Sequence, residues 1–190
     1  MTDPSRRSVP LTVALAASLA AVGVARGDAI TIEPFLGTWQ YADGDEGRER
    51  VDEAIGDAVD GLPFFAEPIA EDRIEARTGP YADLRFEMEG DTLVFSAGDY
   101  GPVRSVLGGP SAQVRGPAGS DVELTQRLEN GRLVQIFEND EGRRRTTYAP
   151  SGDGQSLWMR TRISSPRLGE DVEYRLRYRT AGGDARRASR

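Results

Sequence analysis

Apolar and polar residues alternate with a period of two over residues 81–178, and this pattern constrains the fold more than any other feature of the chain. In the first of these runs Leu84, Phe86 and Met88 alternate with charged residues. Such alternation is typical of strands with one buried face. Asn130-Gly131 is a strong hairpin signal, because both turn positions need positive φ. The pattern predicts a series of antiparallel strands joined by short turns.

A further strand and a helical segment precede these runs. The strand is expected at 36–41, and the segment at 48–77 has apolar residues at helical spacing in two parts, separated by Gly61 and Pro63. Two strands, 103–107 and 113–115, contain or adjoin glycine and proline and are expected to be edge-like or bulged. A sandwich would fit the strands alone. The hairpin meander without long crossovers favours a mainly β, up-and-down antiparallel barrel of about ten strands, with a two-helix insert after the first strand.

The N-terminal segment has the pattern of an export signal. Arg6 and Arg7 precede a short apolar run, and small residues precede a cleavage position before Asp28. The apolar run has about 16 residues, fewer than the ~20 of a spanning helix. We therefore expect a signal peptide at 1–27, possessing some twin-arginine character, a barrel domain at 28–181 and a disordered tail at 182–190. The sequence predicts a soluble protein exported to the periplasm or secreted.

Histidine and cysteine are both absent, and every basic residue is arginine. This composition excludes imidazole bases, thiol nucleophiles, disulfides and thiolate or imidazole metal sites. The net charge of −7 argues against nucleic acid as a partner. Asp43 and Asp45 suggest a calcium loop, but Arg48 and Ala54 occupy its required glycine and glutamate positions, so helix capping explains them better. We expect no enzyme activity, no cofactor and no metal.

Gly37-Thr38-Trp39 in the first strand resembles the Gly-x-Trp motif of the calycins, the lipocalins and especially the fatty-acid-binding-protein-like barrels. The expected helix pair resembles the portal lid of fatty-acid-binding proteins, and 130–135 is similar to one of their late hairpins. The resemblance implies a carrier that holds a small hydrophobic ligand, such as a fatty acid, inside the barrel. Together with the leader at 1–27, it predicts that this carrier is exported. It also implies that Arg175 points inward, whereas the period of two places Arg175 outside.

The inward-facing side chains supply the candidate ligand site. An apolar cavity with a few hydrogen-bonding groups is what a small-molecule site needs. The residues expected to bind the ligand are Phe86, Met88, Phe95, Gln126, Gln135, Phe137, Met159, Tyr174 and Tyr178. The alternative is a barrel filled by its own side chains, acting as a structural or protein-interaction module through its arginine-bearing outer face.

Two further expectations concern tryptophan and arginine. Trp39 either lines the pocket or, as we favour, plugs one end of the barrel with Arg177 stacked on it. Periodicity places Trp158 and the neighbouring arginines of the last two strands on the outer face. The run 143–145, three consecutive arginines, is interpreted as a solvated charge cluster on an exposed hairpin.

Overall fold

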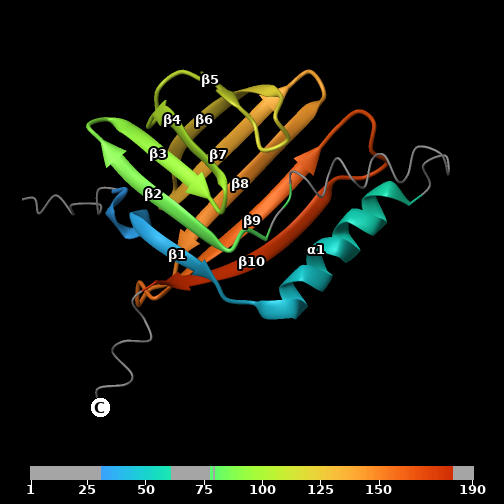
Figure 1. Ribbon diagram of the computed structural model, residues 1–190, viewed down its shortest axis with the longest axis horizontal. Helices are drawn as coiled ribbons and strands as arrows, with labels where there is room; N and C mark the ends of the chain where they lie inside the picture. Colours follow the sequence, from blue (N-terminus) through green and yellow to red (C-terminus); the bar gives the residue numbers. More distant parts are fainter. Residues whose placement is uncertain (1–30, 61–77, 79, 182–190) are drawn as a thin grey trace, which may run out of the picture.

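Ten antiparallel strands form one strongly curved sheet, as a computed structural model of residues 31–60, 78 and 80–181 shows (Figure 1). The strand order is β4-β3-β2-β1-β10-β9-β8-β7-β6-β5, so nearly every strand lies beside its chain neighbours and β1 joins β10. The sheet closes into a near-complete barrel, and the prediction of a mainly β, up-and-down barrel is confirmed. The strands are β1 (Gly37–Tyr41), β2 (Asp83–Glu89), β3 (Thr92–Ala97), β4 (Tyr100–Val106), β5 (Ala112–Arg115), β6 (Asp121–Glu129), β7 (Arg132–Asn139), β8 (Gly142–Pro150), β9 (Ser156–Ser164) and β10 (Val172–Thr180).

The seam of the barrel lies between β4 and β5, the two strands at the ends of the sheet. These are the strands that the glycine and proline content marked as edge-like, and that expectation is confirmed. Proline at position 102 has no N–H to donate to a neighbouring strand. A few contacts bridge the seam: the Tyr100 hydroxyl donates to the Arg115 carbonyl at 2.8 Å, and the Gly108 amide donates to the Gln126 carbonyl at 2.7 Å.

The turn between β6 and β7 fixes the register of this part of the barrel. Asn130 has φ 49° and Gly131 has φ 75°, as the hairpin signal required. Leu128 then pairs with Leu133 and Gln126 pairs with Gln135. Because side chains alternate between the two faces, this register sends both pairs to the inner wall.

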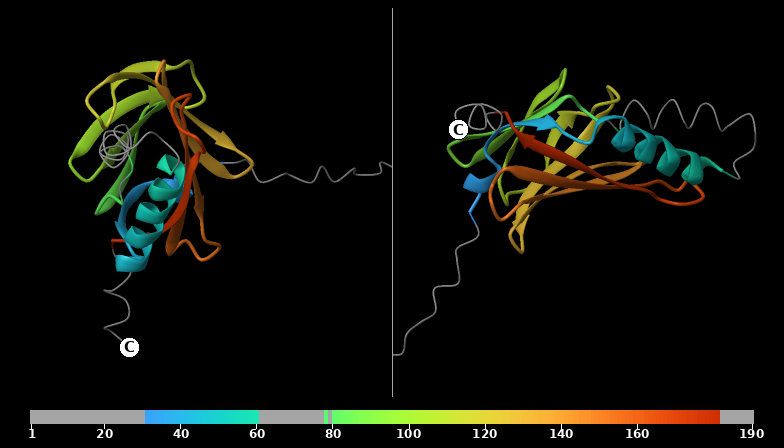
Figure 2. Two further views of the ribbon diagram at one scale, coloured as in Figure 1. Left: turned by 90° about the vertical axis from the view of Figure 1, so that its right-hand side faces the viewer. Right: turned by 90° about the horizontal axis from the view of Figure 1, so that it is seen from below.

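A short 3-10 helix, η1 (Glu33–Phe35), precedes β1, and an α-helix, α1 (Gly44–Val59), follows it. α1 buries Val51, Ile55, Ala58 and Val59 at helical spacing and lies along β10 (Figures 1 and 2). The first part of the expected helical insert is therefore confirmed. The second helix, the signal peptide and the C-terminal tail lie outside the described residues. Among the described helices, none has the length and apolarity that crossing a membrane requires.

Candidate functional site

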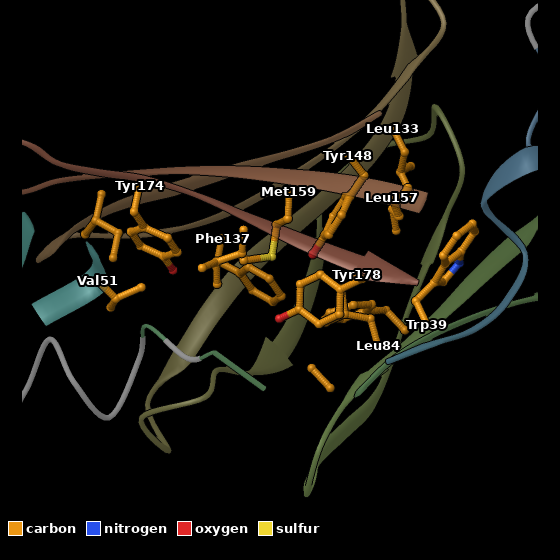
Figure 3. Close-up of a cluster of buried hydrophobic side chains, with 14 of the residues drawn as sticks. Trp39, Val51, Leu84, Leu133, Phe137, Tyr148, Leu157, Met159, Tyr174 and Tyr178 are labelled. Atoms are coloured by element: carbon orange, nitrogen blue, oxygen red, sulfur yellow. The ribbon is translucent and has the colours of Figure 1, made fainter. Parts of the chain in front are cut away.

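Aromatic side chains meet across the inside of the barrel. The ring of Phe86 on β2 lies 5.1 Å from that of Phe95 on β3 and 5.0 Å from that of Tyr148 on β8. Figure 3 shows Tyr148, Tyr178 and Phe137 gathered around Met159. The second pair is edge-to-face, an arrangement that stabilises a core beyond the area that the rings bury. Much of the inner wall is therefore apolar and aromatic, as the period of two predicted.

A row of polar side chains crosses this apolar wall. Its members occupy paired positions on five adjacent strands and are all at least 96% buried: Gln126, Gln135, Thr146, Thr161 and Tyr174. The Thr146 and Thr161 hydroxyls are 3.2 Å apart, and the Tyr174 hydroxyl donates to the Thr78 carbonyl at 2.5 Å. Burying so many polar groups costs free energy unless they are hydrogen-bonded. The row places hydrogen-bonding groups at neighbouring positions from β6 to β10, inside the barrel.

Three buried groups in or near this row lack a hydrogen-bond partner within the part of the chain that the structure describes. They are the Nε2 amides of Gln126 and Gln135 and the hydroxyl of Tyr178. The Oε1 atoms of both glutamines are already used, since Ser105 donates to Gln126 at 3.0 Å and Tyr148 donates to Gln135 at 3.3 Å. Buried donors without partners are rare in native proteins. These donors can meet the polar atoms of a bound molecule or of water.

Arg144 brings a positive charge to the inner wall. It lies on β8 two residues before Thr146, and its side chain is buried, with 8% of its surface exposed. Its guanidinium lies over the ring of Tyr81, 5.8 Å from the centroid, and Nη1 donates to the Tyr81 hydroxyl at 3.4 Å. Burial alone lowers the pKa of Arg144, but the tyrosines Tyr174, Tyr81 and Tyr148 outweigh that effect and raise it. The group therefore stays charged inside the barrel.

The inner wall holds every residue that the sequence predicts to bind a ligand. Eight of the nine are buried and the other, Met88, is half-buried. The structure brings several of them together: Phe86 contacts Phe95, and Gln126 pairs with Gln135. Their role in binding stays a prediction, because burial alone also fits a filled barrel.

Trp39 and Arg177, which the sequence analysis paired, lie on opposite sides of the wall. Trp39 is 3% exposed and its Nε1 donates to the Phe35 carbonyl at 2.8 Å. Arg177 is instead near Trp158, 5.7 Å from the ring centroid, and its Nε lies 3.3 Å from an oxygen of Asp43. The prediction that Arg177 stacks on Trp39 is therefore wrong. The physical reason is the alternation of β10, which points Tyr178 inward and thus Arg177 outward.

Arg175 also lies outside, stacked 4.0 Å from the centroid of Trp158. This confirms the orientation that the period of two predicted, against the inward orientation that the resemblance implied. Arg160 and Arg162 are exposed on the same outer face, as expected. None of these arginines can therefore contribute its side chain to the inside of the barrel.

Arg144 is the residue that sequence reasoning missed. The interpretation of 143–145 as a solvated cluster is wrong for this central arginine, because successive side chains of a strand face opposite sides. Tyr148 is the sequence feature that indicates the orientation of Arg144. An aromatic residue on this strand is expected to face inward, and counting back in twos from Tyr148 reaches Thr146 and Arg144.

The unpartnered Tyr178 hydroxyl leads to a stability prediction. Tyr178→Phe is expected to change the free energy of unfolding at neutral pH by less than about 1 kcal/mol, because no hydrogen bond within the described residues is lost. Burial raises the pKa of Tyr178 above its ordinary value. From about pH 10 upward the unfolded chain loses this proton first, so the wild-type protein should lose stability that the variant retains. Urea unfolding at neutral and alkaline pH measures both effects.

Tyr148→Phe is the matched control. Burial also raises the pKa of Tyr148, but its hydroxyl donates to Gln135. This variant should lose about 1 kcal/mol at neutral pH. If both substitutions lower the free energy of unfolding at neutral pH by the same amount, the assignment of Tyr178 as the unpartnered hydroxyl is contradicted.

Comparison with solved structures identifies the class of fold. The chain is similar to lipid binding protein 8 of Caenorhabditis elegans, with a TM-score of 0.52 and 13% identity over 79% of this chain and 97% of that one. It is similar to a secretary abundant heat soluble protein of Ramazzottius varieornatus, with a TM-score of 0.52 and 16% identity over 78% and 96% of the two chains. A third is the fatty acid transporter REP1-NXSQ, with a TM-score of 0.50 and 10% identity over 78% and 97%.

These similarities, together with the near-closed ten-stranded barrel, define the fold as that of the calycins, in the form found in fatty-acid-binding-protein-like barrels. The resemblance noted from Gly37-Thr38-Trp39 is thus confirmed at the level of fold. No protein-family model matches the sequence, and no curated protein matches it.

Proposed function

We propose that this protein is a non-enzymatic carrier that reversibly binds a fatty acid, or a similar apolar molecule with an acidic end, inside its barrel. The observation that carries the proposal is the buried guanidinium of Arg144 beside the polar row, on a wall that is otherwise mostly apolar. A cavity with apolar walls and a few fixed polar groups suits a small amphipathic ligand. Two of the similar structures are named for lipid binding or fatty acid transport, which supports the same class of ligand.

Each part of the wall would have its own role in binding. Phe86, Phe95 and Met159 would contact the hydrocarbon chain, which gains free energy when it leaves water. Arg144 would hold the carboxylate through charge-assisted hydrogen bonds, the strongest kind that side chains form. Gln126 and Gln135 would donate their amide hydrogens to further oxygens of the ligand.

The carrier is proposed to act outside the cytoplasm. This rests on the sequence of residues 1–27, with its two arginines, apolar run and small residues before Asp28. Mass spectrometry of the protein isolated from its own source tests the proposal. A mature chain that begins at Asp28 supports export, and a chain that retains its leader in the cytosolic fraction contradicts it.

Displacement of a fluorescent fatty-acid analogue tests the binding function. A long-chain fatty acid should displace the analogue from one site per chain, with an affinity of about 1 μM or tighter. Acetate, which has the carboxylate but no hydrocarbon chain, is the control and should not displace it. Native mass spectrometry should detect the same one-to-one complex.

The competing function is the structural or interaction module with a filled barrel. It predicts that the analogue does not bind and that the protein isolated from its source contains no apolar molecule. Either finding with correctly folded protein would favour the module over the carrier.

A further inference from the structure

The outer face of β8, β9 and β10 contains a groove of about 770 Å³. Six arginines and one glutamate are among its lining residues, in a chain whose net charge is −7. The groove is therefore strongly basic on an acidic protein. Half-buried Trp158 lies within it, under the stacked guanidinium of Arg175.

The arginines of this groove are regularly spaced. Arg160 pairs with Arg175 on the neighbouring strand, and Arg162 pairs with Arg145 on the other side. Adjacent strands lie ~5 Å apart, and alternate residues of one strand lie ~7 Å apart. Glu173, Asp171 and Glu129 neutralise part of the charge, and Asp43 pairs with the sixth arginine of the lining, Arg50 of α1. Arg132 and Arg175 form no ion pair among the described residues. The groove thus has an excess of positive charge, and its arginine positions are ~5–7 Å apart.

The matching negative surface lies on α1. Its outward side has a row of exposed acids at intervals of three and four residues, namely Glu46, Glu49, Glu53, Asp57 and Asp60, the last at the C-terminal cap. Residues at these intervals are neighbours on a helix surface, ~5–6 Å apart. Within the described part of the chain, none of the five forms an ion pair. We call this row the acidic stripe.

The acidic stripe is unfavourable for the isolated chain. Like charges three or four residues apart destabilise a helix. Asp57 and Asp60 also lie at the C-terminal end of α1, where the helix dipole disfavours negative charge and where the last turn has no basic residue. The stripe points away from its own barrel, because Val51 and Ile55 occupy the opposite side of the helix. The groove of the same molecule therefore does not neutralise it.

We propose that the basic groove binds the acidic stripe of a second copy of this chain. The two surfaces have opposite charge and similar spacing, and both are accessible on the outside of the molecule. Glu49, Glu53 and Asp57 span ~12 Å of helix. The groove offers a similar length, because Trp158 and Arg162 are ~13 Å apart along β9. This contact is independent of any ligand inside the barrel.

Self-association of the full chain, measured by sedimentation equilibrium, tests the proposal. The protein should associate in a buffer of about 0.01 M salt and dissociate in about 1 M salt, since the Debye length falls from ~30 to ~3 Å. A groove variant, Arg160→Glu with Arg175→Glu, and a stripe variant, Glu49→Arg with Glu53→Arg, should each weaken association at low salt by at least about tenfold. An equimolar mixture of the two should restore it, because each reversed surface then meets its complement.

Matched controls separate this contact from an effect of net charge. Arg85→Glu with Arg104→Glu makes the same charge change as the groove variant on exposed positions of β2 and β4. Glu123→Arg with Glu138→Arg makes the same charge change as the stripe variant, at exposed positions of β6 and β7. Both controls should associate like the wild-type protein. A chain that stays monomeric at low salt would overturn the proposal. So would a mixture without restored association, or a groove variant that associates normally.

Discussion

Replacing Arg144 with methionine is expected to weaken the binding of a long-chain fatty acid by about tenfold to a hundredfold, because a charge-assisted hydrogen bond contributes ~1.5–3 kcal/mol. Arg144 is the one arginine that the described strands bury in the inner wall. Methionine keeps much of its length and apolar volume, and substitutions that conserve volume are the ones that a packed interior tolerates best. Displacement of a fluorescent fatty-acid analogue measures the loss.

A fatty alcohol of the same chain length shows whether the loss comes from the carboxylate. The wild-type protein should bind the acid more tightly than the alcohol, and Arg144→Met should bring the two affinities close together. Arg143→Met is the matched control, since Arg143 lies next to Arg144 on β8 but is exposed. It should leave both affinities unchanged. Equal loss for acid and alcohol would show that Arg144 only shapes the wall, and the proposed role in holding the acidic end would be wrong.

The difference between Arg144 and its neighbours shows how far the sequence determines the site. Alternation along a strand is a local property, so the sequence predicts correctly that Phe86 and Gln126 face inward and that Arg175 faces outward. The same rule applied to 143–148 would have placed Arg144 inside. Three consecutive arginines interpreted as one charge cluster predict the wrong face for Arg144, because this compositional argument ignores the direction of each side chain.

Contacts across the barrel cannot be predicted from the alternation along single strands. The Tyr174 hydroxyl donates to the carbonyl of Thr78, 96 residues earlier in the chain, and Ser105 on β4 reaches Gln126 on β6 across the seam. These contacts depend on how the curved sheet closes, and closure depends on all the strand registers together. The ion pair of Arg177 with Asp43 cannot be predicted locally either, because the two residues come close only when α1 packs along β10.

Replacing Trp39 with alanine is expected to lower the free energy of unfolding by about 3–5 kcal/mol. Its side chain is 97% buried in the same cluster as Phe35, whose carbonyl accepts the indole hydrogen bond. Alanine would remove this hydrogen bond and leave a cavity that the strands around it can fill only in part. Urea unfolding followed by circular dichroism measures the loss. The expected value is a large fraction of the total stability of a small domain.

Trp158→Ala is the matched control, because Trp158 is the other tryptophan of the chain and lies half-buried on the outer face. Its described partners are the guanidinium groups of Arg175 and Arg177, and contacts of this kind at exposed sites contribute ~0.5–1 kcal/mol. The control should therefore lose much less stability than Trp39→Ala. If Trp39→Ala costs less than about 1 kcal/mol, the strands close over the site without the indole. Trp39 would then not be the plug of the barrel, and the burial of the Gly-x-Trp motif would need another explanation.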